Sequence, residues 1–255
     1  MSEPLTALQL TDMHLHATRD SKMRGVRTYD TYHAILRAAL ERNRRKPDVV
    51  VATGDIVQDE SREGYEHFRE SLADLGVPIL VTSGNHDDPA MMAEVLDSQP
   101  FRVDRSVRFD HWSLIAVSTH LMGEDAGGLG ERRLASLERT ISEHIDQHVL
   151  VCMHHHPVPM GSRWLDAVAL RDADRFVQMV DRCDNVRAVT CGHVHQASER
   201  ERNGVTYFST PSTCSQFLPG SDFFALDERP PGCRWFYMFE DGRLETEIQW
   251  LDDND

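Results

Sequence analysis

Residues 48–55 read DVVVATGD, and residues 78–87 read PILVTSGNHD. In both stretches a short apolar run ends abruptly in a glycine that is followed by Asp or Asn. The VVVA core of the first run is apolar throughout, as in strands that are covered on both faces. Open α/β sheets bind their ligands at the carboxyl ends of such strands. The two stretches therefore predict an α/β fold whose functional residues follow its strands.

The same alternation of strands and helices extends along the chain. Residues 30–45 predict a helix, because apolar residues such as Tyr32 and Ile35 recur on one helical face. Asp88 and Pro89 are typical of a helix start, with an N-cap followed by proline. The pattern indicates βαβ units, and the strand-rich second half indicates two sheets packed together. Further strands are predicted at 5–11, 106–110, 112–118, 148–153, 186–191 and 204–209, helices at 65–75, 131–145 and 172–182, and a hairpin at 234–250.

The composition excludes several classes of protein. The chain has 255 residues, 40% of them hydrophobic, and a formal net charge of −15. This length suits one α/β domain with a real core. The acidic balance argues against binding of nucleic acid, and no apolar stretch approaches the roughly 18 residues of a membrane span. Five cysteines without a C-x-x-C motif, and a start without a signal-peptide pattern, favour a reduced, cytoplasmic protein.

Histidine is the outlier of the composition, since the chain has 14 of them and several fall in short motifs. Each motif alone has an ordinary interpretation, such as a capped turn, a solvated loop or a strand end. Their recurrence at the ends of predicted strands favours one shared site. The five motifs, in order, are Asp12-x-His14, Gly54-Asp55, Gly84-Asn85-His86-Asp87, His154-His155-His156-Pro157 and Gly192-His193-Val194-His195.

The residue types in these motifs indicate a metal site. Imidazoles and carboxylates without thiolates suit borderline divalent ions such as Zn, Mn, Fe or Co. An alternating pair at a strand end places both side chains on one side, because the period of a strand is two. Two such pairs with a bridging carboxylate make a two-metal site, whose ions lie about 3.5–4 Å apart and clamp a phosphoryl group. Two such ions also supply local positive charge for a phosphodiester inside an acidic protein.

The complete set D-x-H, G-D, G-N-H-D, H and G-H-x-H resembles the signature of the calcineurin-like metallophosphoesterase superfamily. The stretches ATGDIVQD, HHHPVPMGSRWLD, CGHVHQ and TPSTCSQF extend the similarity to its class III cyclic-nucleotide phosphodiesterases. The resemblance covers nearly the whole chain and implies a single domain over residues 1–255. It also implies a four-layer α/β-β/α sandwich, with two mixed sheets flanked by helices, and a dinuclear metal centre.

The resemblance further implies a role for each motif residue. The H-x-P pattern of the family selects His155 as a ligand, and His154 stays the alternative because three successive histidines leave the register ambiguous. The substrate would contact Asn85, His86, His14 and His195. Asp55 would bridge two divalent ions, whose ligand sets are Asp12, His14, Asp55 and His195 for one, and Asp55, Asn85, His193 and one histidine of residues 154–156 for the other.

His86 and Asp55 carry the predicted catalytic roles. The imidazole of His86 would face the phosphate, where it would stabilise charge or protonate the leaving 3′-oxygen. Asp87 would accept a hydrogen bond from a neighbouring imidazole or backbone amide and fix its orientation. For Trp164 two interpretations stay open: a wall for an adenine ring, or packing of its own loop.

The resemblance predicts hydrolysis of 3′,5′-cyclic AMP to 5′-AMP, by attack of a metal-bridging hydroxide on phosphorus. One alternative is a metallophosphodiesterase for other diesters, such as 2′,3′-cyclic nucleotides or glycerophosphodiesters. The other is a non-catalytic scaffold that binds a metal or a nucleotide. The expected partner is a small-molecule cyclic nucleotide, with no nucleic acid and no membrane. The identity of the two ions and the oligomeric state stay open.

Overall fold

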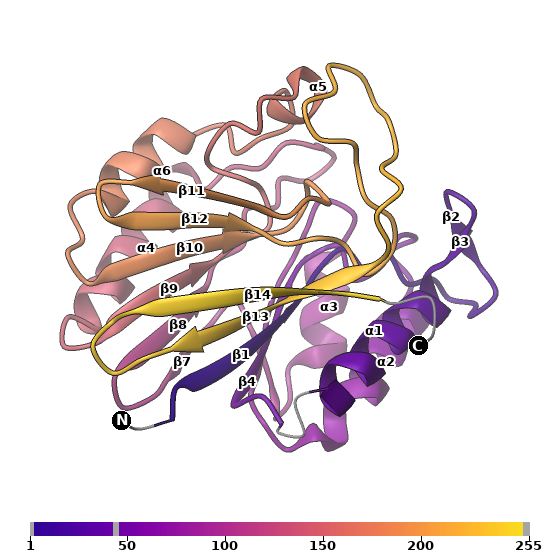
Figure 1. The fold of residues 1–255 in the computed structure, drawn as a ribbon, viewed down its shortest axis with the longest axis horizontal. Coiled ribbons are helices and arrows are strands. Elements are labelled where there is room, and N and C mark those ends of the chain that lie inside the picture. The colour runs from indigo at the N-terminus through magenta and orange to yellow at the C-terminus, as the bar shows by residue number, and fades with distance from the viewer. Residues whose placement is uncertain (1–2, 43–45, 252–255) are drawn as a thin grey trace.

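Two six-stranded sheets pack face to face at the centre of the molecule, and helices cover their outer faces (Figure 1). These elements come from a computed structural model that describes residues 3–42 and 46–251. Residues 43–45, at the end of the predicted helix 30–45, lie outside the described residues. Within the described ranges, no helix combines the length and the apolar character that a membrane crossing needs.

The first sheet has the order β14-β13-β1-β4-β5-β6. Strands β1, β4, β5 and β6 run parallel, while β13 and β14 form an antiparallel edge beside β1. Three helices pack on its outer face: α1 (Thr28–Arg42), α2 (Arg62–Leu72, continued by the 3-10 turn Ala73–Leu75) and α3 (Pro89–Leu96). The strands are β1 (Leu5–Leu10), β4 (Val49–Thr53), β5 (Ile79–Thr82), β6 (Phe101–Val103), β13 (Gly232–Met238) and β14 (Leu244–Trp250).

The second sheet has the order β11-β12-β10-β9-β8-β7, and its four central strands run parallel. Helices α4 (Gly130–Glu143) and α6 (Ala173–Val180) pack on its outer face. The strands are β7 (Ser106–Arg108), β8 (Trp112–Ala116), β9 (His148–Cys152), β10 (Val186–Cys191), β11 (Ser198–Arg202) and β12 (Val205–Ser209). Two small elements complete the chain: the hairpin of β2 (Lys22–Met23) and β3 (Val26–Arg27), and the short helix α5 (Arg163–Asp166).

The alternation of side chains along the strands produces the layers. In β4, Val50 and Ala52 pack against the helices, whereas Val49 and Val51 lie between the sheets. In β9, Leu150 lies between the sheets, and its two neighbours in sequence pack on the helix side. Each strand therefore contributes apolar side chains to two cores. This arrangement confirms the predicted four-layer α/β-β/α class of fold.

Most predicted elements are confirmed, with ends shifted by a few residues. Asp88 caps α3 as expected, since its carboxylate accepts hydrogen bonds from the amides of Ala90 at 2.9 Å and Met91 at 3.2 Å. The prediction missed β6, β11, the β2–β3 hairpin and α5. These elements are short, and the exposed edge strand β11 reads SERER, which carries no apolar signal.

A buried polar network joins the two sheets near the carboxyl ends of their strands. The amide nitrogen of Gln9, on β1, donates to the Thr53 hydroxyl on β4 at 2.8 Å. The hydroxyls of Thr190 and Thr210 donate to the amide oxygen of Gln9 at 2.6 Å each. Thr190 belongs to β10 of the second sheet, so the satisfied Gln9 amide fixes strand ends of one sheet against those of the other.

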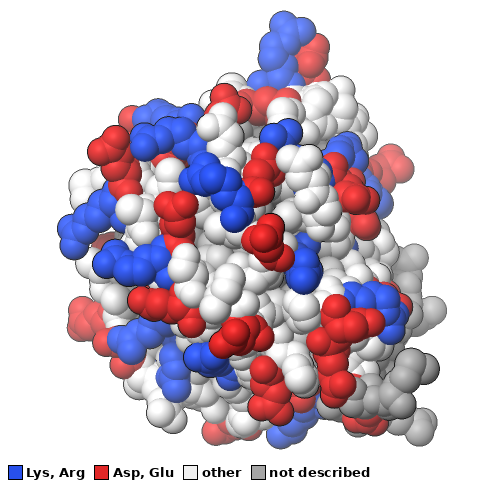
Figure 2. Space-filling model, turned by 90° about the vertical axis from the view of Figure 1, so that its left-hand side faces the viewer, with Lys and Arg blue, Asp and Glu red and all other residues white. Residues whose placement is uncertain are grey.

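The left-hand face of Figure 1 carries both signs of charge, with positive and negative side chains interspersed (Figure 2). Ion pairs across the described surface include Arg182–Glu138 at 3.1 Å and Arg202–Asp181 at 2.8 Å. Exposed pairs of this kind contribute about 0–1 kcal/mol to stability each. The net negative charge is therefore not gathered into a single field on this face.

Candidate metal centre

The predicted motif residues follow five parallel strands whose carboxyl ends meet at one edge of the sandwich. Asp12 and His14 follow β1, Asp55 follows β4, and Asn85 follows β5 in the first sheet. The second sheet supplies the histidines after β9 and β10. Apart from the half-buried Asn85 and His86, these side chains are buried. The donor atoms within 4.8 Å of one another form four groups: His154, His155 and His193; Asp12, His14 and His195; His14, Asp55 and His86; and Asp12, Asp55 and His154.

One part of the site gathers Asp12, His14 and His195. The Nε2 atom of His195 lies 3.2 Å from Asp12 Oδ1 and 3.2 Å from His14 Nε2. The other ring nitrogen of His195, Nδ1, donates to the Ser215 carbonyl oxygen at 2.7 Å. This hydrogen bond fixes the tautomer, so that the lone pair of Nε2 faces Asp12 and His14.

A second part gathers Asp55, Asn85 and His154. The Nε2 atom of His154 lies 3.4 Å from Asp55 Oδ1 and 3.1 Å from Asn85 Oδ1. Its Nδ1 donates to the Thr53 carbonyl oxygen at 2.7 Å, which again places Nε2 in the site. The second carboxylate oxygen of Asp55 lies 3.9 Å from His14 Nε2. Asp55 therefore reaches both parts of the site.

The three successive histidines take different positions. His155 lies near His154 and His193, but both of its ring nitrogens are engaged, at 2.7 Å with the Thr119 hydroxyl and at 3.1 Å with the Asp125 carbonyl oxygen. His156 is buried behind His193, with its ring stacked on that of His193 at 5.8 Å. Of the two candidate ligands, His154 and His155, it is therefore His154 that lies against Asp55.

The backbone at the site is held in an uncommon conformation. Asp12, His14, Asp55, His193 and His195 all have positive φ angles, between 47° and 68°. Each such residue costs on the order of 1–3 kcal/mol and persists only where surrounding structure enforces it. Non-glycine residues of this kind cluster at functional sites. Their concentration here marks this edge of the sandwich as the site of chemistry.

Two glycines of the motifs give the ligands room. A Cβ atom on Gly84 would overlap the Oδ1 atom of Asp55. A Cβ atom on Gly192 would overlap the Thr11 hydroxyl and lie 2.7 Å from Asp12 Oδ2. The glycines therefore allow backbone to pass directly beside the two carboxylates, which explains why they precede the ligand residues in sequence.

The donor set fits divalent cations. Carboxylate, amide oxygen and imidazole donors suit Mn, Fe, Co and Zn. The bond between Zn and an imidazole nitrogen is about 2.0–2.1 Å long. Donors that share such an ion lie roughly 3–3.4 Å apart, as the Nε2 atoms of His14 and His195 do at 3.2 Å. The Nε2 atom of His193 is buried and has no hydrogen-bond partner in the described structure. A buried imidazole nitrogen without a hydrogen-bond partner fits a metal ligand.

A family model of calcineurin-like phosphoesterases matches residues 5–197. The chain belongs to this family. The phosphoesterase is 36% identical over 247 residues to the 3′,5′-cyclic adenosine monophosphate phosphodiesterase CpdA of Escherichia coli strain K12, with 96% of the chain and 90% of the relative covered. It is 35% identical over 248 residues to CpdA of Pseudomonas aeruginosa, with the same coverage of 96% and 90%. A dimetal phosphatase from Danio rerio shares the fold, with a TM-score of 0.70, 15% identity and coverage of 98% and 100% of the two chains.

The charges of the phosphoesterase site favour metal binding. Burial raises the pKa of Asp12 and Asp55, but the imidazoles of His195 and His154 outweigh burial and hold both pKa values below the ordinary range. Burial lowers the pKa of His14 to about 3. It also holds the pKa of His193 well below its ordinary range. The carboxylates are therefore ionised and these two imidazoles are neutral, which are the forms that bind metal ions.

His154 is the exception, and it leads to a prediction. Burial lowers its pKa, but the Asp55 carboxylate outweighs burial and raises the pKa to about 9 in the ion-free protein. A metal ion bound by His154 would displace a proton below that pH, so we expect affinity to rise by up to about tenfold per pH unit toward pH 9. Adding Mn²⁺ to the ion-free protein in weak buffer with a pH indicator should release protons at pH 7 and none from this group above about pH 10. Equal release by His154→Gln would contradict the assignment.

His86 lies beside the donors and is held by a residue that the sequence did not point to. Its backbone amide donates to Asp55 Oδ1 at 2.9 Å, and its ring lies 5.2 Å from that of His14. The side-chain amide of Gln58 donates to His86 Nδ1 at 3.2 Å. This contact places the proton of a neutral imidazole on Nε2.

Asp87 braces the loops around the donors, as expected for a group that accepts from backbone amides. Its carboxylate accepts from the amides of Gly84 at 2.8 Å and Ile56 at 3.1 Å, and from the Tyr65 hydroxyl at 3.1 Å. The loops after β4 and β5 are thereby tied together. Asp87 itself lies outside the donor groups.

A cavity of about 310 Å³ opens over the donors of the phosphoesterase. Trp164, in the short helix α5, lies in the wall of this cavity. The cavity is also lined by Met23 of the two-residue strand β2, Arg24 of the turn that follows it, and Phe217 of the segment after β12, none of which carries a periodic signal in the sequence. Its other lining residues are His14, Asp55, Gln58, Asn85, His86, Asp125, Leu165, Val168, His193 and His195.

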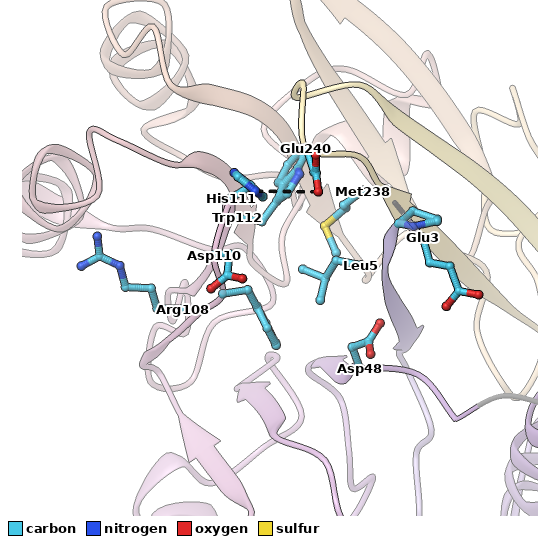
Figure 3. Close-up of a pocket in the computed structure, with 11 residues that line it drawn as sticks. Glu3, Leu5, Asp48, Arg108, Asp110, His111, Trp112, Met238 and Glu240 are labelled. Carbon is cyan, nitrogen blue, oxygen red and sulfur yellow. Dashed lines mark ion pairs between the residues drawn. The ribbon is translucent and has the colours of Figure 1, made fainter. Parts of the chain in front are cut away.

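Two of the larger cavities show that volume is a poor guide to this chemistry. One, of about 460 Å³, lies at the amino ends of the parallel strands, where Leu5, Trp112 and Met238 form an apolar floor (Figure 3). Its only ion pair among the drawn residues joins His111 and Glu240 at 4.0 Å. The other, of about 550 Å³, lies beside α4. Neither contains a donor of the groups described above, so size does not identify the functional cavity.

Proposed function

We propose that this protein hydrolyses 3′,5′-cyclic AMP to 5′-AMP with two divalent ions. The position of Asp55 between two sets of buried donors carries the proposal, and the activity printed for the relatives from Escherichia coli and Pseudomonas aeruginosa supports the substrate. The proposed ligands are Asp12, His14, Asp55 and His195 for one ion, and Asp55, Asn85, His154 and His193 for the other.

When bound, such ions lower the pKa of water and neutralise charge on a phosphate. The chain supplies the rest. Asn85, His14 and His195 line the cavity and would hold the phosphate against the donors. Because Gln58 donates to Nδ1, the neutral His86 imidazole carries its proton on Nε2, and we assign to this N–H a hydrogen bond that stabilises the charge developing on the leaving 3′-oxygen, which takes its proton from solvent. Asp55 fixes His86 by accepting from its backbone amide.

The role of Gln58 leads to a test of the hydrogen bond that we assign to His86. Gln58→Leu removes the hydrogen bond to His86 without a change in charge, so kcat for 3′,5′-cyclic AMP should fall about 10- to 100-fold. An aryl diester releases p-nitrophenolate, which is stable as an anion and needs little help from His86, so its kcat should change less than about threefold. Gln58→Glu replaces the amide donor with an acceptor, which draws the imidazole proton to Nδ1, so it should not restore kcat for 3′,5′-cyclic AMP. An equal loss with both substrates would show that Gln58 has only a structural role.

The substrate itself is tested by a panel of phosphodiesters. The protein is stripped of metal, reloaded separately with Mn²⁺, Fe²⁺, Co²⁺ or Zn²⁺, and assayed with 3′,5′-cyclic AMP, 2′,3′-cyclic AMP, a glycerophosphodiester and an aryl diester. The proposal requires the largest kcat/KM with 3′,5′-cyclic AMP. A preference for another diester would favour the alternative phosphodiesterase, and a protein that neither binds metal nor hydrolyses any diester would be a scaffold. A cytoplasmic location, a single domain and the absence of nucleic-acid and membrane partners stay predictions.

A further inference from the structure

The cavity continues beyond the metal donors into a wall of aromatic side chains. Phe217 belongs to the segment between β12 and β13, Trp164 belongs to α5, and Arg24 lies at the turn of the β2–β3 hairpin. We propose that Trp164 and Phe217, with Arg24 above them, form the subsite for the purine base of the substrate. This inference rests on the proposed hydrolysis of a cyclic nucleotide.

The wall begins directly at the metal donors. The ring of Phe217 stacks on that of His195, with centroids 4.1 Å apart and planes only 7° apart. Trp164 meets Phe217 edge to face at 5.0 Å. A substrate whose phosphate lies at His195 therefore has an aromatic surface one ring away. Any nucleobase can stack on such a surface, because every base has a π face.

A polar group in this wall lacks a partner. The indole Nε1 of Trp164 is buried and has no hydrogen-bond partner among the described residues. Buried indole N–H groups ordinarily find an acceptor. The ring nitrogens of a purine are acceptors, so a bound base offers this group what the protein does not. The unpartnered donor thus fits a ligand that brings an acceptor to this wall, as a purine does.

Arg24 covers the wall from the hairpin side. Its guanidinium carbon lies 4.1 Å from the ring centroid of Phe224 and 5.7 Å from that of Phe217. The side chain is exposed and therefore free to lie over a base that enters against Phe217. Arginine stacks favourably on aromatic faces. In Figure 1 the β2–β3 hairpin projects at the right of the sandwich, on the side to which the parallel strands run.

The wall is held in place before any ligand binds. Arg163 of α5 pairs with Asp222 at 2.6 Å, and the Ser162 hydroxyl donates to the Ser221 carbonyl oxygen. These contacts fasten α5 to the segment that carries Phe217. A preformed wall avoids the cost of ordering loops on binding. The volume of about 310 Å³ lies in the range of about 300–1,000 Å³ that small-molecule sites occupy.

Trp164→Leu tests the subsite. Its KM for 3′,5′-cyclic AMP should rise about 5- to 100-fold, the range that loss of base–aromatic stacking gives, with kcat changed less than about threefold. The base-free control is the 3′,5′-cyclic phosphate of methyl riboside, in which a methoxy group replaces adenine; its KM should not change. Adenosine should inhibit the wild type competitively and lose affinity by the same factor in the variant.

Two further variants keep the test independent of folding. Phe223→Leu removes an aromatic ring that is 80% exposed, lies in the same segment and does not line the cavity, so its KM should match that of the wild type. Arg24→Gln changes an exposed side chain and should raise KM for 3′,5′-cyclic AMP alone. Unchanged KM values in Trp164→Leu and Arg24→Gln, in a protein that hydrolyses 3′,5′-cyclic AMP, would overturn the subsite. A wild type that hydrolyses only base-free diesters would instead overturn the proposed function.

Discussion

Asp55→Asn is expected to reduce kcat for 3′,5′-cyclic AMP by at least about 100-fold and to lower the metal content of the purified protein. The carboxylate reaches His14 on one side, at 3.9 Å, and His154 on the other, at 3.4 Å. A neutral amide cannot offset the charge of two cations. It also places an NH₂ group toward one of these ligands. Loss of an outer partner alone costs 10- to 100-fold, so loss of the shared ligand should exceed that range.

The measurements are metal content by elemental analysis and steady-state turnover after reloading. Asp59→Asn is the matched control, since it makes the same change four residues later at a carboxylate that accepts from the Ala17 amide at 3.0 Å and lies outside the donor groups. It should keep its metal and most of its activity. Wild-type metal content and turnover in Asp55→Asn would refute the bridging role.

His154→Ala should remove about half of the bound metal and reduce kcat by at least about 100-fold. His154 Nε2 faces Asn85 and Asp55, and its Nδ1 is committed to a backbone carbonyl, so no neighbour can replace the lost donor. The space left by the side chain can admit free imidazole. Adding imidazole should therefore restore part of the activity and of the metal content of His154→Ala.

His155→Ala decides the register of the three histidines. Both ring nitrogens of His155 bind protein groups, so this variant should lose thermal stability but keep its metal stoichiometry, and imidazole should not raise its activity. The opposite pattern, with metal lost and imidazole rescue in His155→Ala alone, would return His155 to the ligand set. Metal content and melting temperature are measured separately, so loss of a ligand is distinguished from loss of stability.

The sequence predicted the part of the molecule that strand periodicity controls. Apolar runs followed by Gly-Asp or Gly-Asn-His-Asp identified the strand ends, and parallel strands bring such ends to one edge. The prediction of His155 rested on a family pattern, because the alternation of side chains along a strand does not extend to residues 154–156. Strand β9 ends at Cys152, so the side chains of residues 154–156 point where the loop directs them.

Contacts between loops that are distant in sequence could not be predicted from the sequence. Gln58 meets His86, 28 residues further along, only because β4 and β5 lie side by side. Phe217 reaches His195 because its segment folds back over the site. Arg24 lies on a hairpin of two-residue strands, which is too short for any periodic signal. Trp164 was identified, but only the structure decides that it lines the cavity.

The proposed metal donors come from both sheets. Asp12, Asp55 and Asn85 follow strands of the first sheet, and His154 and His193 follow strands of the second. Bound cations would therefore cross-link the two sheets at the carboxyl ends of their parallel strands. A ligand present at 100 times its Kd and bound only by the native state adds about 2.7 kcal/mol to the free energy of unfolding. Loss of the ions would then lower the free energy of unfolding as well as abolish the activity.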